Sequence, residues 1–173
     1  DVHYKVINSK DFGVPQNRER IYIIGFLEKV DFKFPVSKKK STLVDIIDSS
    51  VEINTISKIL KDNIDSHLKS HVKYHEIKNL KYLLAYEVRK SRSTFRFDNL
   101  SPTLTAKMGT GGNNVPVLVN LQRKLTTDEC LKIQGYPKNY KIKPNNSQSY
   151  KQIGNSVSVP VIKSLANEMV KFI

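Results

Sequence analysis

Three side chains with forked hydrogen-bond donors alternate along one short segment: Gln16, Arg18 and Arg20. In an extended strand every second side chain lies on the same face, so this spacing predicts that the three donors point the same way. Amide and guanidinium groups in this arrangement can hold a carbonyl, carboxylate or phosphate oxygen. The segment is therefore a candidate grip for such a group. A solvated strand edge, on which Glu19 balances the charge, is the alternative that the pattern leaves open.

A second candidate is the segment SPTLTAKMGTGGNN at residues 101–114, which combines hydroxyl groups, a lysine and several glycines. Glycines let the backbone approach a ligand closely, and exposed backbone amides bind phosphate groups. The segment has no Gly-Lys-Ser/Thr at the spacing of a P-loop, and no strand-to-helix context of a dinucleotide-binding loop. Its composition indicates either a phosphate-contacting loop or an ordinary hairpin loop.

The other reactive side chains give weaker indications. His67, His71 and His75 recur every four residues, which predicts one shared face if this region is helical. That stripe has only Glu76 as a nearby additional ligand, so we expect a solvated helix face and no metal site. Cys130 is the only cysteine, and its place in the hydrophobic staple with Leu125 predicts a packed core residue rather than a nucleophile.

The strands that must position these candidates are visible in the hydrophobic pattern. Apolar, β-branched runs at residues 2–8 and 20–26, separated by turn residues, predict a strand–loop–strand unit. Residues 93–120 alternate between apolar and polar side chains, which predicts short strands around the glycine-rich loop. Residues 51–92 predict helical or irregular structure.

Helix boundaries are marked most clearly in the last third of the chain. Thr126 and Glu129 form a capping box, and Gly135 predicts the end of the helix that they begin. A short helix capped by Ser41 is also expected. A last helix is predicted from Ser158 as cap, Pro160 in the first turn and a stripe of Val161, Leu165, Met169 and Ile173.

The composition indicates a foldable chain: of 173 residues, 39% are hydrophobic and 26% charged, and the apolar runs are too short to span a membrane. The net charge of +13 favours a polyanionic partner, although a lysine-biased composition explains the same surplus. A single cysteine excludes a disulfide framework and fits a reducing cytoplasm. The sequence begins at Asp1 without Met, so we expect it to be cut from something longer.

Taken in order, several segments resemble the C-terminal part of DNA cytosine-5 methyltransferases. DFGVPQNRERIYIIGF at 11–26 resembles the Gln-x-Arg-x-Arg segment of that family. RKLTTDECLKIQGYP at 123–137 resembles the helix that follows its target recognition domain, and YKQIGNSVSVPV at 150–161 resembles its final cofactor-side motif. Between them, SPTLTAKMGTGGNNVPV resembles the recognition loop that contains a Thr-Leu pair. The order and spacing of the set are more specific than any one segment.

The resemblance implies methyl transfer from S-adenosylmethionine to carbon 5 of a cytosine flipped out of double-stranded DNA. It implies that Arg20 hydrogen-bonds the carbonyl oxygen of the flipped cytosine, while Arg18 and Gln16 brace the strand. The residues that it assigns to the cofactor are Asn155, Ser156 and Val157. The residues that it assigns to DNA are Thr103, Leu104, Lys107, Gly111, Gly112 and Arg96.

Two further segments of the family are not found in these 173 residues, which contain no Pro-Cys and no Glu-Asn-Val. We therefore expect no methyl transfer by this chain alone, because the attacking cysteine is missing. The expected partners are double-stranded DNA and a catalytic portion, supplied either by the same enzyme or by a separate subunit. The resemblance also implies a bacterial or phage source, a cytoplasmic location and a link to restriction–modification.

The expected fold class is mixed α+β: the end of a methyltransferase α/β sheet plus a small target recognition domain. Residues 1–35 are expected to form the last strands of the catalytic domain, 36–147 the recognition domain, and 148–173 a helix that returns to the catalytic domain. Two other functions remain open: a non-catalytic DNA-binding module, and a basic RNA-binding or ribosome-associated protein. The ordered motifs and the lack of an aromatic stacking pattern on strands argue against the RNA-binding function.

Overall fold

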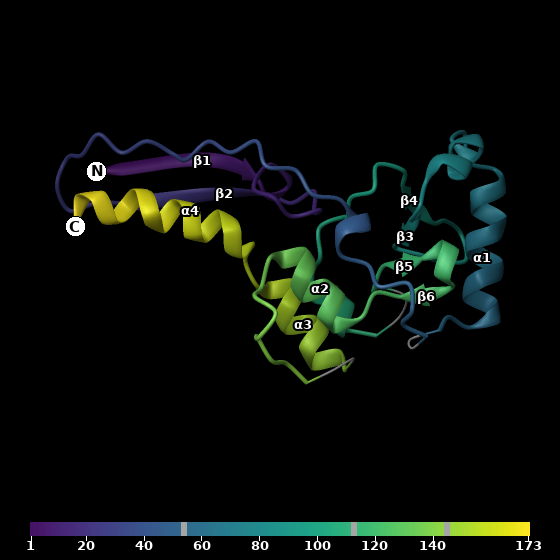
Figure 1. Ribbon diagram of the computed structural model, residues 1–173. Helices are drawn as coiled ribbons and strands as arrows, with labels where there is room; N and C mark the ends of the chain where they lie inside the picture. The colour runs from purple at the N-terminus through teal and green to yellow at the C-terminus, as the bar shows by residue number, and fades with distance from the viewer. Residues whose placement is uncertain (53–54, 112–113, 144–145) are drawn as a thin grey trace.

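The computed structural model describes residues 1–52, 55–111, 114–143 and 146–173. Figure 1 shows an elongated molecule with an arm and a body. The arm consists of strands β1 and β2, residues 26–34 and helix α4, and both chain termini lie at its outer end. The body consists of a four-stranded sheet with helices α1, α2 and α3. The mixed α+β architecture expected from the sequence is confirmed. No helix of the described residues is long and apolar enough to cross a membrane.

The regular elements follow the chain from the arm through the body and back. The strands are β1 (Val2–Asn8), β2 (Glu19–Gly25), β3 (Leu84–Tyr86), β4 (Thr94–Arg96), β5 (Val117–Leu118) and β6 (Arg123–Lys124). The α-helices are α1 (Lys58–Lys69), α2 (Thr127–Gln134), α3 (Ser147–Asn155) and α4 (Val159–Met169). Short 3-10 helices are η1 (Ser9–Asp11), η2 (Leu43–Asp45), η3 (Tyr74–Asn79), η4 (Ala106–Gly109), η5 (Val119–Leu121) and η6 (Val170–Phe172).

The arm is an antiparallel hairpin with a helix against one of its faces. β1 and β2 pair in register from Val2 with Gly25 to Asn8 with Glu19. Because side chains alternate across a strand, one face contributes Ile7 and Ile24 to a core shared with α4. The opposite face carries Val2, Tyr4, Val6, Ile21 and Ile23, which are between 58% and 73% exposed.

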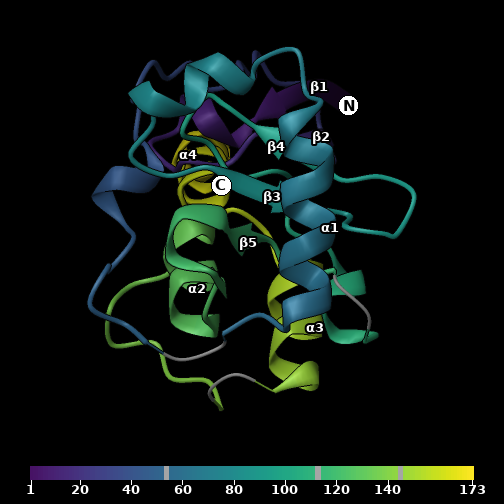
Figure 2. The same cartoon turned by 90° about the vertical axis from the view of Figure 1, so that its right-hand side faces the viewer.

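The body is a sheet in the strand order β4–β3–β5–β6, with all neighbours antiparallel. Period-two alternation divides its side chains between two cores. Leu83, Ala85 and Val117 pack with α1, which lies in front of the sheet in Figure 2. Leu84 and Leu118 pack on the other side, in the core that contains residues of α2 and α3. Helices therefore cover both faces of this sheet.

The capping box of α2 is confirmed, since Thr126 Oγ1 accepts from Glu129 N and a Glu129 carboxylate oxygen accepts from Thr126 N. The expected end is confirmed as well, because Gly135 has a φ of 82°. Cys130 is fully buried in the core, as expected. Burial, and secondarily the charge of Glu129, raises the pKa of its thiol, so the thiol stays neutral.

Two helical features expected from the sequence were wrong: the shared face of the histidines and the helix capped by Ser41. The three histidines do not share a helical face, because α1 ends at Lys69, just after its last buried residue, Leu68. No group of three metal-ligating side chains occurs among the described residues. The expected helix at Ser41 is a single 3-10 turn with a capping box between Thr42 and Asp45.

The two ends of α4 and the strand β3 also differ in detail from the sequence pattern. Ile173 is 97% exposed and lies beyond η6, so it does not extend the buried stripe of α4. Ser158 is the N-cap of α4 but its hydroxyl makes no capping hydrogen bond. The strand β3 falls within a region that the pattern assigned to helical or irregular structure, because three residues are too few to show a period.

Candidate functional site

The loop that precedes β2 runs beside the start of the glycine-rich loop, where the arm meets the body. Gln16 and Ser101 form an isolated parallel bridge. Ser101 N donates to the carbonyl oxygen of Pro15 at 2.7 Å, and Asn17 N donates to that of Ser101 at 2.9 Å. These bonds bring together two of the segments that sequence reasoning selected, although more than 80 residues separate them.

Gln16 is fully buried at this junction and joins the glycine-rich loop to α2. Its Oε1 accepts from Leu104 N at 3.0 Å, and its Nε2 donates to Gln134 Oε1 at 2.9 Å. Gln134 Nε2 in turn donates to the carbonyl oxygen of Ile153 on α3 at 3.0 Å. The two buried amides thus connect Leu104 to Ile153 through three hydrogen bonds, a polar network whose donors and acceptors are matched.

Arg18 makes a second connection between the same two regions. Its Nη1 donates to the carbonyl oxygen of Leu104 at 2.7 Å, and its Nη2 donates to that of Ser156 at 2.9 Å. Only 7% of the residue is exposed. Burial, and secondarily the charge of Arg20, lowers the pKa of Arg18. The guanidinium therefore serves backbone carbonyls and is not open to a ligand.

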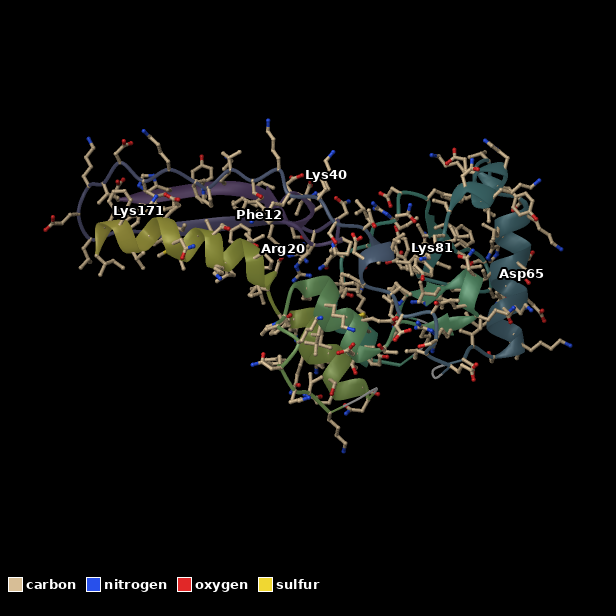
Figure 3. All side chains as sticks on the ribbon, in the orientation of Figure 1. Phe12, Arg20, Lys40, Asp65, Lys81 and Lys171 are labelled. Atoms are coloured by element: carbon tan, nitrogen blue, oxygen red, sulfur yellow. The ribbon has the colours of Figure 1, made fainter. Side chains whose placement is uncertain are left out.

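Arg20 differs from its two neighbours in the motif because it is exposed. Its Nη1 donates to the carbonyl oxygen of Glu19 at 2.6 Å. Figure 3 places Arg20 at the inner end of the hairpin, beside the body. The prediction of one three-donor grip is therefore corrected: Gln16 and Arg18 are buried in structural bonds, and Arg20 is the member that a ligand can reach.

The glycine-rich loop is packed tightly against α3. A Cβ on Gly154 would lie 2.1 Å from the carbonyl carbon of Thr105, and one on Gly109 would lie 2.2 Å from the carbonyl oxygen of Ser147. Both distances are far below van der Waals contact, so these two positions require glycine for steric reasons. The loop and α3 consequently form one packed unit.

The residues expected to contact DNA fall into different environments. Arg96, Thr103 and Lys107 line one hollow of about 310 Å³, which also includes Asn17. The Thr103 hydroxyl donates to the carbonyl oxygen of Asn17 at 2.9 Å. The hollow combines the cationic side chains of Arg96 and Lys107 with the carboxylate of Glu87. Apolar groups line it as well, so it suits a ligand that has both hydrogen-bonding and apolar parts.

The other three expected DNA contacts do not share this hollow. Leu104 is only 1% exposed and belongs to the hydrophobic core, so its side chain is out of reach of a ligand. Gly111 is exposed, with a φ of 78° and open space around the position of a Cβ. Gly112 lies outside the described residues.

The residues expected to face the cofactor lie where α3 gives way to α4. Asn155 and Val157 are exposed, and Ser156 between them is half-buried. The Ser156 hydroxyl donates to the carbonyl oxygen of Ile153 at 2.6 Å, and its own carbonyl oxygen is held by Arg18. The segment thus presents an amide and an apolar side chain from a backbone fixed by buried donors.

Sequence reasoning missed two buried polar residues: Gln134, which holds this site, and Arg123, which pairs with Glu129 on α2. Gln134 is a polar residue on the buried side of α2, next to Ile133, and this interruption of an apolar face is the signal that could have identified it. Arg123 forms a buried ion pair with Glu129, with both Nη atoms 2.8 Å from the carboxylate oxygens. The sequence contains no signal for this pair beyond the presence of an arginine, because Glu129 was already assigned to the capping box.

The chain matches the family described as C-5 cytosine-specific DNA methylase over residues 1–171. It is 38% identical over 179 residues to type II methyltransferase M.Bsp6I of Bacillus sp. (strain RFL6), covering 98% of this chain and 55% of that protein. It is 34% identical over 174 residues to type II methyltransferase M.HaeII of Haemophilus aegyptius, covering 98% of this chain and 50% of that protein. The chain spans about half the length of the curated relatives it matches.

Solved structures support the same relation at the level of the fold. The Entamoeba histolytica methyltransferase EhMeth aligns with a TM-score of 0.68 and 20% identity, over 99% of this chain and 54% of that one. A Spodoptera frugiperda DNMT2 mutant aligns with a TM-score of 0.55 and 18% identity, over 98% of this chain and 58% of that one. The match along nearly the whole sequence shows that this chain belongs to the C-5 cytosine-specific DNA methylase family.

Proposed function

We propose that this chain is the DNA-recognising portion of a DNA cytosine-5 methyltransferase, which transfers a methyl group from S-adenosylmethionine to carbon 5 of a flipped cytosine. The observation that carries the proposal is the buried network at Gln16 and Arg18. It joins the loop at Leu104 to the segment at Ser156, so the regions that we assign to DNA and to the cofactor meet at one junction.

Arg20 is the residue that we assign to the target base. Its exposed guanidinium sits at that junction, where it can donate to the carbonyl oxygen of a cytosine that has left the duplex. Attack on the ring increases negative charge on that oxygen, so a fixed positive donor stabilises the transition state more than the ground state. Arg18 and Gln16 act indirectly, by fixing the backbone on both sides.

The cofactor is assigned to Asn155, Ser156 and Val157. The exposed amide and apolar side chain fit a ligand that has both polar and apolar parts, and Arg18 fixes the carbonyl of Ser156. When bound, S-adenosylmethionine supplies the methyl group. The residues of this chain bind and orient it from one side.

The remaining catalytic groups are assigned to a catalytic portion, meaning a polypeptide segment or subunit that carries the Pro-Cys sequence. The only cysteine of this chain is buried and its pKa is raised, so it is not an available thiolate. The exposed apolar face of the arm is the surface that we assign to the catalytic portion. An isolated two-stranded hairpin is marginally stable, and a contiguous apolar patch of this kind marks an interaction surface.

The test is transfer of a labelled methyl group from S-adenosylmethionine to duplex DNA, by this chain alone and mixed with the catalytic portion. We expect no transfer by the chain alone and transfer by the mixture. Transfer by the chain alone would refute the assignment of the nucleophile to another portion. DNA binding without transfer by the mixture would favour the alternative, a non-catalytic DNA-binding module.

A further inference from the structure

Arg96 forms part of the wall between two hollows on the surface of the body. It is the last residue of β4, and its side chain is only 19% exposed. On one side lies the hollow of about 310 Å³ with Thr103 and Lys107. On the other lies a hollow of about 420 Å³ that includes His71 and Phe97, whose rings stack with centroids 4.9 Å apart. The arginine side chain therefore lines both hollows.

Asp98 fixes the orientation of the Arg96 guanidinium. Arg96 Nε donates to Asp98 Oδ1 at 3.0 Å, and Arg96 Nη2 donates to Asp98 Oδ2. Asp98 Oδ1 also accepts from Leu100 N at 3.2 Å, so the backbone holds the carboxylate in turn. The pair occupies the Nε–Nη2 edge of the guanidinium, while no hydrogen bond from the described residues occupies Nη1. The Nη1–Nη2 end is therefore presented as a pre-oriented fork.

A pre-oriented fork that already has an acidic partner suits a base better than a phosphate. The carboxylate offsets the positive charge, which weakens attraction to the DNA backbone. It also restricts the side chain in advance, so less conformational entropy is lost when two hydrogen bonds form. The major-groove edge of guanine offers two acceptors, O6 and N7, at the spacing of such a fork. In the same hollow Lys107 remains available for a DNA phosphate, whereas the Thr103 hydroxyl already donates to the carbonyl oxygen of Asn17.

We propose that Arg96, held by Asp98, reads one guanine of the methylated sequence through the major-groove atoms O6 and N7. This inference rests on the proposed function, because it requires that the hollow faces duplex DNA. It adds a specificity determinant: one position of the recognised sequence depends on this side chain, whereas the chemistry at the cytosine does not.

The experiment maps the sequence context of methylated cytosines by bisulfite sequencing, in DNA treated with this chain plus its catalytic portion. The variants are Arg96→Lys, which keeps the charge and loses the fork, and Asp98→Ala, which removes both acceptor oxygens that hold the fork. The control is Arg92→Lys, whose wild-type side chain is exposed and 4.0 Å from Glu87. We expect the wild type and the control to require guanine at one position, and both other variants to lose roughly tenfold to a hundredfold of that preference.

A second measurement tests the contact at a single atom. Guanine at that position is replaced by 7-deazaguanine in a synthetic duplex, and the affinity of the wild type is compared with that of Arg96→Lys. We expect the replacement to weaken binding by the wild type about tenfold and to leave binding by Arg96→Lys unchanged.

The outcomes separate this inference from the proposed function. Methylation in an unchanged context by Arg96→Lys overturns the inference and leaves the proposed function standing. A uniform loss at all contexts, or an equal 7-deazaguanine effect in both proteins, also overturns it, since the arginine then serves only as a surface charge or backbone contact. Absence of methylation by the wild type overturns both.

Discussion

The four-stranded sheet of the body is covered on both faces, whereas the two-stranded sheet of the arm is covered on one. In the body, α1 packs on one side and the core of α2 and α3 on the other. In the arm, α4 covers the face that carries Ile7 and Ile24. The opposite face leaves five large apolar side chains exposed.

This difference separates what the chain does by itself from what it does with a partner. The body has two closed cores and a hollow on its surface, all formed by residues of this chain. The arm has half a core, and burying its outer face requires further polypeptide. We therefore expect substitutions in the body to change stability or DNA recognition directly. Substitutions on the outer face of the arm should act only through association.

The largest effect on stability is expected at the buried ion pair of the body. Arg123→Met leaves Glu129 buried without its partner and should lower the free energy of unfolding by about 3–5 kcal/mol. Lys132→Met is the control, because its partner Asp128 is largely exposed and such pairs contribute about 0–1 kcal/mol. Urea unfolding of the chain measures both. Equal losses would mean that the body does not depend on this pair.

The next effect is expected in the chemical step, at the inner end of the arm. In the active mixture, Arg20→Ala should lower the single-turnover rate about a hundredfold, while affinity for duplex DNA changes little. Thr103→Ala should show the reverse balance, because Thr103 lines the hollow of the body. Glu19→Ala should be mild, because its side chain points to the other face of the strand. Equal effects of Arg20→Ala and Glu19→Ala would contradict the assignment of the target base.

Substitutions at the junction between arm and body should lower the free energy of unfolding by an intermediate amount. Gln134→Met removes the amide between Gln16 and Ile153, leaving buried groups unpaired at a cost of about 1–3 kcal/mol. Gln152→Met is the matched control, since Gln152 is exposed on α3. Backbone amide hydrogen exchange around Leu104 should be faster in Gln134→Met than in the wild type, and unchanged in Gln152→Met. Unchanged exchange there would show that the amide network does not hold the loop.

The smallest effect on stability is expected on the outer face of the arm. Tyr4→Ser and Ile23→Ser replace side chains that are already 73% and 67% exposed. In the chain alone, each should change the midpoint of urea unfolding by less than the equivalent of about 0.5 kcal/mol. A large loss would mean that this face is covered within the chain and is not an interface.

Local signals in the sequence were sufficient for elements whose ends are fixed by their own side chains. The capping box at Thr126 and Glu129 and the left-handed Gly135 are examples, because each depends on residues within one turn. The hairpin was predictable for the same reason, since alternation and turn residues are local. The end of α1 was not predictable, because it depends on where the helix stops packing on the sheet, just after Leu68.

The environment of each site residue could not be predicted, because it depends on distant backbone. Gln16, Arg18 and Arg20 have equivalent spacing, but only the first two meet carbonyl or amide groups from residues 104–156. Gln134 could not be recognised as a site residue from the sequence, because its partner Gln16 lies near the other end of the chain. The order of the family-like segments predicted the family, whereas the different environments of their residues depend on the fold.

The most direct test of the difference between arm and body is a titration of methyl transfer against the concentration of this chain, with the catalytic portion held constant. We compare the wild type with Tyr4→Ser/Ile23→Ser and with the control Lys29→Ser, an exposed polar position on the arm. The account predicts that the double variant needs at least tenfold more chain to reach half-maximal transfer and reaches the wild-type maximum, while the control matches the wild type. Identical curves for all three proteins would contradict the claim that the outer face of the arm binds the catalytic portion.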